Sequence, residues 1–97
     1  MGSRENKVEK HLKKQIKLRG GESYKWVSPG MSGVPDQICI VQGHIWFVEV
    51  KTVDGLLSPV QQRQIKRLLK VDARVWVVSG HAEVNLLMEE VDRVIQS

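Results

Sequence analysis

The chain has 97 residues, with 15 Lys and Arg against 11 Asp and Glu, so its formal net charge is +4. This length fits one domain with one modest core and excludes a multidomain enzyme. The chain contains no run of about 18 apolar residues, which excludes a membrane-spanning helix, and we expect an intracellular protein. Cys39 is the single cysteine, so an intrachain disulfide and a cysteine zinc site are excluded.

Positive charge is concentrated at the beginning of the chain. Residues 1–25 carry eight Lys or Arg against three Glu, whereas residues 81–97 carry one Arg against four acids. A basic end of this kind favours a polyanionic partner such as nucleic acid. The alternative interpretation is an ordinary solvated helix face.

Apolar periodicity and turn residues predict an α/β chain with the element order α, three β, α, β, α. Val8, Leu12 and Ile16 recur at helical spacing, and Ser58-Pro59 is a strong helix start, a capping hydroxyl followed by proline. The apolar run ARVWVVS predicts a buried strand. In chain order, the predicted elements are a helix at 4–18, a strand at 23–27, the two strands of a hairpin within 33–51, a helix at 58–70, a strand at 73–79 and a helix at 82–96.

The hairpin GVPDQICIVQGHIWFVEVK carries charge at the outer ends of its apolar strands. A turn centred on Gln42-Gly43, where Gly tolerates the positive φ of a tight turn, pairs Asp36 with Glu49. Opposed residues share a face with Cβ atoms about 5 Å apart, and the strand period of two puts Lys51 on the same face. The sequence therefore predicts two acids and a lysine at one end of the hairpin.

Directly opposed acids destabilise a hairpin, and a divalent cation between them would remove the repulsion. Mg²⁺ takes oxygen ligands and is typically held by one or two carboxylates with waters and phosphates. Asp36, Glu49 and the main-chain carbonyl of Val50 are the candidate ligands, and the Lys51 ammonium could orient a water or stabilise developing negative charge. These groups suit phosphodiester hydrolysis. A solvated sheet end is the alternative.

Three further polar residues lie on or near apolar helix faces. At 100° per residue, Glu5 lies within about 20° of the centre of the apolar stripe of the first helix and Glu9 about 60° from it. Glu5 could face a site, or be a first-turn acid favoured by the helix dipole. Gln61 lies on the apolar stripe of the second helix, where its amide could bind a metal-bound water or a phosphate, or simply belong to the helix start.

Basic residues on several predicted elements are candidates for contact with a phosphate backbone. For each of them, the alternative is an exposed side chain that contacts only solvent. The candidates are Lys7, Lys14, Lys25, Arg63 and Lys66.

Together these residues resemble the PD-(D/E)xK nuclease superfamily, in which an acid opens one hairpin strand and an acid-x-Lys triplet closes the next. Pro35-Asp36 and Glu49-Val50-Lys51 carry that pattern here. A wider string is similar to the virus-type replication-repair nuclease (VRR-NUC) domain, in its small phage and bacterial form, over about residues 4 to 79. That string comprises Glu5-x-x-Val8-x-x-x-Leu12, the two glycines at 20–21, Lys25, GVPD, FVEVK and LSPVQ.

The resemblance implies a restriction-endonuclease-like core over residues 1–97, a mixed sheet of about four strands flanked by helices. It implies that Asp36 and Glu49 hold the metal, that Lys51 assists the attacking water, that Glu5 completes the acidic cluster and that Gln61 belongs to the site. Glu9 competes with Glu5 for the helix role.

The expected activity is that of a Mg²⁺-dependent endodeoxyribonuclease, with Mn²⁺ as a substitute, acting as a homodimer on branched DNA such as four-way junctions. We expect a cytoplasmic protein of a bacterial or phage-infected cell, with no small-molecule cofactor and no membrane partner. The alternatives are a non-catalytic nucleic-acid-binding module and a nuclease for RNA or linear duplex DNA.

Overall fold

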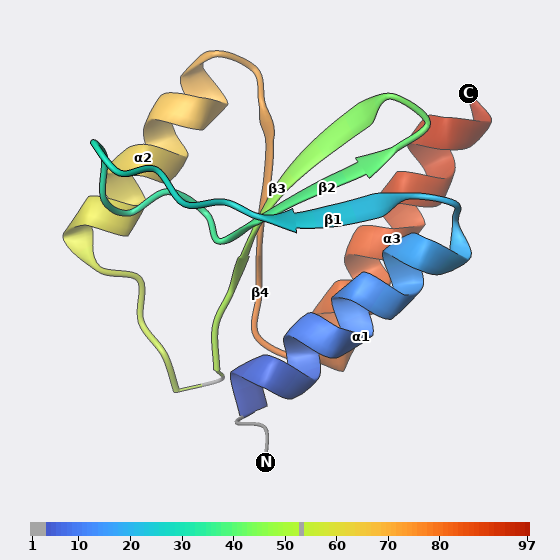
Figure 1. Cartoon of the computed structure of the whole chain (residues 1–97), viewed down its shortest axis with the longest axis horizontal. Helices are drawn as coiled ribbons and strands as arrows, with labels where there is room; N and C mark the ends of the chain where they lie inside the picture. The colour runs from blue at the N-terminus through green and yellow to red at the C-terminus, as the bar shows by residue number, and fades with distance from the viewer. Residues whose placement is uncertain (1–3, 53) are drawn as a thin grey trace.

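The computed structural model describes residues 4–52 and 54–97, with side chains from residue 6 onward (Figure 1). Its four strands form one mixed sheet in the order β1-β2-β3-β4, with β1, β2 and β3 antiparallel and β3 and β4 parallel. The predicted element order and mixed sheet are confirmed. The elements are α1 (Arg4–Leu18), β1 (Glu22–Lys25), β2 (Gln37–Val41), β3 (His44–Val50), α2 (Pro59–Lys70), β4 (Arg74–Val78) and α3 (His81–Gln96).

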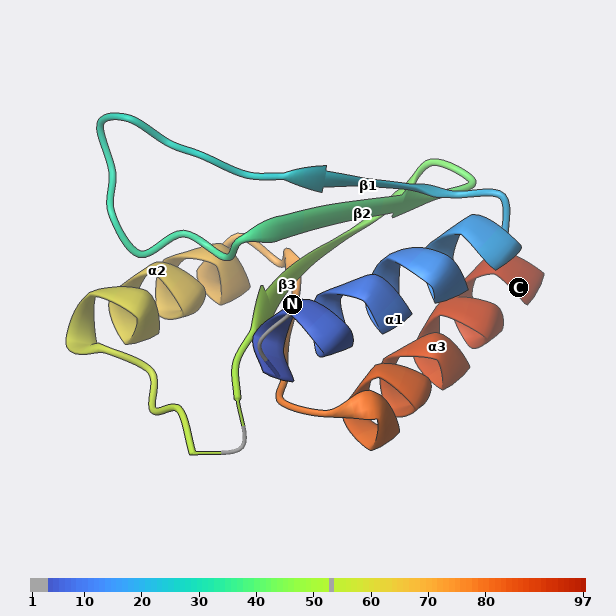
Figure 2. The same ribbon diagram turned by 60° about the horizontal axis from the view of Figure 1, so that its bottom comes forward.

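Helices α1 and α3 lie side by side on one face of the sheet, and α2 packs on the other face against β4 (Figure 2). The apolar stripe of α1 is buried there, and Trp46 and Val48 of β3 are fully buried beneath the two helices. Helix α2 has no buried residue, so the core lies almost entirely on the α1–α3 side. None of the helices in the described part of the chain is long and apolar enough to cross a bilayer.

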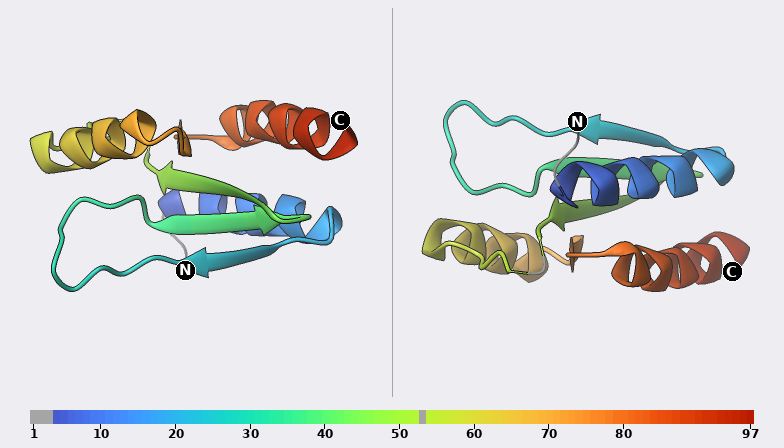
Figure 3. Two further views of the ribbon diagram at one scale, coloured as in Figure 1. Left: turned by 90° about the horizontal axis from the view of Figure 1, so that it is seen from above. Right: turned by 90° about the horizontal axis from the view of Figure 1, so that it is seen from below.

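Two sequence predictions need correction. The strand expected at 23–27 is Glu22–Lys25, although its pairing continues as Trp26 N–H donates to the Asp36 carbonyl at 2.9 Å. The strand expected to be buried has only Val78 buried, because β4 is the last strand of the sheet and α2 covers it only in part. Figure 3 shows α2 and α3 on either side of this strand.

The predicted hairpin register is confirmed. Val41 pairs with His44 across the turn, and the ladder continues to the pair Gln37 and Val48. Gln42 and Gly43 have φ values of 50° and 82°, the positive values that a tight two-residue turn demands. The next pair outward from Gln37 and Val48 would be Asp36 and Glu49.

The loop that leads into β2 is packed against α2. Gly33 has a φ of +84°, and a Cβ built on it would lie 2.5 Å from the Val60 Cγ1 atom. Only glycine combines that φ with such close approach. This contact brings the strand end that carries Asp36 next to the first turn of α2.

Candidate active site

Asp36 is held at the end of the hairpin by main-chain contacts. Its Oδ1 atom accepts a hydrogen bond from the Val50 N–H at 3.1 Å, across the strand pair. Its carbonyl accepts the Trp26 N–H, so its own main chain is paired on the other side. The carboxylate therefore has a fixed place beside the strand that carries Glu49.

Glu49 is a buried carboxylate, and the residue is only 5% exposed. Its Oε2 atom accepts a hydrogen bond from Gln61 Nε2 at 3.1 Å and lies 3.8 Å from Lys51 Nζ. A buried charge is costly unless it is paired and hydrogen-bonded, and here both partners come from the predicted site. The structure thus brings Glu49, Lys51 and Gln61 together.

Gln61 combines the two roles that the sequence left open. As the third residue of α2 it forms a reciprocal capping box, in which its N–H donates to Ser58 Oγ at 3.1 Å and its Oε1 accepts the Ser58 N–H at 2.9 Å. The remaining amide group, Nε2, donates to Glu49. One side chain therefore caps α2 and orients the buried carboxylate.

The structure describes the side chain of only one of the two candidate helix acids, Glu5 and Glu9. The Glu5 side chain lies outside the part of the chain whose side chains are described. Glu9 is half-buried and accepts a hydrogen bond from Gln37 Nε2 at 2.5 Å. Strand alternation places Gln37 on the α1 side of the sheet, opposite the face of Asp36. Sequence reasoning missed Gln37, although a glutamine among the inward-facing residues of QICIV was a signal.

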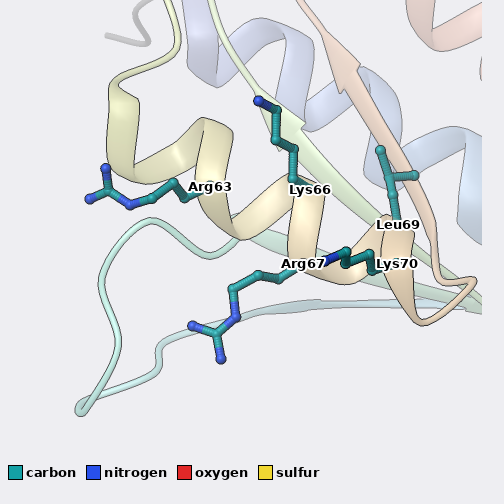
Figure 4. Close-up of a pocket in the computed structure, with 5 residues that line it drawn as sticks. All are labelled: Arg63, Lys66, Arg67, Leu69 and Lys70. Carbon is teal, nitrogen blue, oxygen red and sulfur yellow. The ribbon is translucent and has the colours of Figure 1, made fainter.

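The predicted nucleic-acid-binding residues Lys7, Lys14, Lys25, Arg63 and Lys66 are exposed and lie on three different elements. On α2, Arg63 and Lys66 join further cations around a hollow of about 590 Å³ (Figure 4). Helical spacing places these cations on the side of α2 opposite Gln61. The basic face of α2 therefore points away from Glu49. The residues that line the hollow are Arg63, Lys66, Arg67, Leu69 and Lys70.

The architecture defines a class of protein. A mixed four-stranded sheet has a central hairpin with an acid just before one strand and an acid-x-Lys triplet at the end of the next. This is the restriction-endonuclease-like core of the PD-(D/E)xK nucleases.

Comparison with known proteins identifies the family within this class. No family sequence model matches the chain. The chain is 41% identical over 78 residues to "Putative nuclease p44" of Acyrthosiphon pisum secondary endosymbiont phage 1, a match that covers 79% of this chain and 84% of that protein. A solved structure described as a "VRR_NUC domain" is similar with a TM-score of 0.86 and 37% identity, covering 91% of this chain and 97% of its own. The chain belongs to the VRR-NUC family.

Proposed function

We propose that this protein is a Mg²⁺- or Mn²⁺-dependent endodeoxyribonuclease that hydrolyses phosphodiester bonds in branched DNA. The observation that carries the proposal is the cluster at the hairpin end, where Gln61 and Lys51 both contact the buried Glu49 carboxylate. Asp36 lies at the end of the facing strand. Membership of the VRR-NUC family supports nucleic acid as the substrate.

The side chains present fit a hard divalent cation. Asp36 and Glu49 supply carboxylate oxygens and Val50 a main-chain carbonyl, the donors that Mg²⁺ and Mn²⁺ prefer. Among the described side chains, no three His, Cys, Asp or Glu gather into a metal site. The ligand set therefore has two described carboxylates, and Glu5 is proposed as a further acid. When bound, the ion would polarise a phosphoryl oxygen and lower the pKa of a coordinated water.

The residues around the cation would have separate roles in hydrolysis. The water oxygen forms a bond to phosphorus as one ester P–O bond breaks, which leaves a phosphate on one DNA end and a hydroxyl on the other. The Lys51 ammonium would donate a hydrogen bond to the attacking water or to the phosphoryl oxygen where negative charge develops. Gln61 would hold the Glu49 carboxylate in its orientation during the reaction.

The proposed assembly is a homodimer, because a four-way junction must be cut in two DNA strands. One site cuts one strand, so paired cuts across a four-way junction need two sites, which a two-fold dimer supplies. Light scattering at several concentrations, with and without junction DNA, tests this assembly. A particle that remains one chain in mass on the junction would contradict it.

Cleavage of a labelled substrate panel tests the activity. Four-way, flap and linear DNA and a matched RNA are incubated with the protein in Mg²⁺, in Mn²⁺ and in EDTA. We expect cleavage of the four-way junction that depends on the metal and is absent with EDTA. Cleavage of RNA alone, or equal cleavage of linear DNA, would replace the proposed substrate, and no cleavage in any lane would refute the enzyme.

A further inference from the structure

Gln37 has an unusual environment for the first residue of a strand. It is fully buried, and its Nε2 atom donates to Glu9 Oε1 at 2.5 Å. Its Oε1 atom is the one buried side-chain polar atom without a hydrogen-bond partner among the described residues. The buried amide therefore donates a hydrogen bond through its nitrogen, while its oxygen accepts none.

An unmet buried acceptor lowers stability, so packing does not explain this glutamine. The other residues of β2 that face the helices, Cys39 and Val41, are apolar and fully buried. An apolar side chain at position 37 would continue that pattern without the unmet oxygen. The hydrogen bond from Nε2 to the Glu9 carboxylate offsets the cost of the unmet oxygen. Hydrogen bonds to ionised acceptors are stronger than those between neutral groups.

The position of this bond relates it to the site. Gln37 directly follows Asp36 in the chain, and Glu9 follows Glu5 by one helical turn. The bond therefore joins the early part of α1 to the strand end that carries Asp36. At the other end of the helix, Arg19 Nε donates to Asp92 Oδ1 at 2.7 Å and ties α1 to α3 instead.

We propose that Glu9 and Gln37 form a polar anchor that fixes the early part of α1 against the Asp36 strand end, and that Gln37 is thereby a positioning residue of the nuclease site. The proposal rests on the proposed function for its catalytic consequence, but the anchor itself is a property of the free protein. Groups that orient metal ligands from outside the ligand shell typically affect metal affinity or activity by about 10- to 100-fold.

Hydrogen exchange of the free protein tests the anchor independently of activity. Gln37→Met keeps the length of the side chain but cannot donate a hydrogen bond to Glu9. Asp92→Asn is the matched control, because it weakens the contact with Arg19 at the opposite end of α1. We expect amides 8–12 to exchange at least about tenfold faster in Gln37→Met, with amides 14–18 unchanged, because the opening is local. In Asp92→Asn, amides 14–18 should exchange faster and amides 8–12 should be unchanged. Unchanged exchange at 8–12 in Gln37→Met would overturn the anchor.

Mn²⁺ binding and cleavage test the positioning role. Gln37→Met should bind Mn²⁺ about 10-fold more weakly and show a lower kcat at unchanged KM for DNA, whereas Asp92→Asn should match the parent protein in both.

The outcomes separate the two proposals. A faster-exchanging helix with parental Mn²⁺ affinity overturns the positioning role. If the parent protein cuts no DNA, the proposed function fails, while the exchange rates and Mn²⁺ titrations still decide the anchor and its effect on the site.

Discussion

The buried Glu49 carboxylate is contacted by two side chains, those of Gln61 and Lys51. Its Oε2 atom is shared by the Gln61 amide at 3.1 Å and the Lys51 ammonium at 3.8 Å, and the Lys51 side chain is itself only 19% exposed. Helical spacing was sufficient to predict that Gln61 faces inward. The Glu9–Gln37 bond was not predictable, because strand alternation gives the face of Gln37 but not the helix residue that meets it.

Substitution of Gln61 tests its dual role as a helix cap and as a partner of Glu49. Gln61→Glu retains a residue type that serves in a capping box, but it places a second carboxylate against Glu49. We expect the single-turnover cleavage rate to fall by about 10- to 100-fold, with the helix content by circular dichroism unchanged. Gln62→Glu, the same substitution at the exposed neighbouring position, is the control. Equal losses in the two variants would show that charge on α2, rather than contact with Glu49, causes the effect.

For the helices and strands, apolar periodicity and turn chemistry predicted most of the architecture. Ser58-Pro59 begins α2 as expected, and the hairpin turns at Gln42-Gly43. Burial of β4 was predicted wrongly, because a continuous apolar run does not reveal that a strand lies at the edge of a sheet. Helix α1 is tied to its neighbours by different polar contacts at its two ends, and those contacts are long-range in sequence and so have no local signal.

The contact between α1 and α3 gives a pH-dependent prediction. Hydrogen bonds from Arg19 hold the pKa of Asp92 below its ordinary value of 3.8. The stability that this pair contributes is therefore complete above about pH 4 and is lost as the pH falls through the lowered pKa. Because the Asp92 side chain is 40% exposed, we expect only about 0.5–1 kcal/mol.

Urea unfolding of the parent protein and of Asp92→Asn measures this contribution. The difference in unfolding free energy should be present at pH 7 and should shrink toward pH 2. A difference that persists undiminished at pH 2 would assign the effect to packing rather than to the ion pair.

Across the molecule, positive charge lies on several surfaces. Arg63 and Lys66 lie on the side of α2 opposite Gln61, and Lys7 and Lys14 are exposed on α1, across the sheet. Sequence composition predicted a polyanionic partner, but only the fold shows that these cations do not form one patch beside Glu49. DNA that contacts α2 and the site together would have to pass around the helix.

The salt dependence of DNA binding tests the contribution of α2. Arg63→Gln with Lys66→Gln should reduce the slope of log K against log salt by about 1 for each phosphate contact removed. Lys17→Gln is the control, because Lys17 already pairs with Glu22 at 2.9 Å. An unchanged slope in the α2 variant would show that this face is solvated in the complex.

If Asp36 and Glu49 form one metal-dependent cleavage site, single-turnover cleavage of a bound four-way junction requires both carboxylates. Asp36→Asn and Glu49→Gln are compared with Glu89→Gln, which removes an exposed acid from α3. We expect all variants to bind the junction with parental affinity. Asp36→Asn and Glu49→Gln should cut it at least about 100-fold more slowly in Mg²⁺, and Glu89→Gln at the parental rate. A parental cleavage rate in either site variant would show that its carboxylate is not part of the cleavage site.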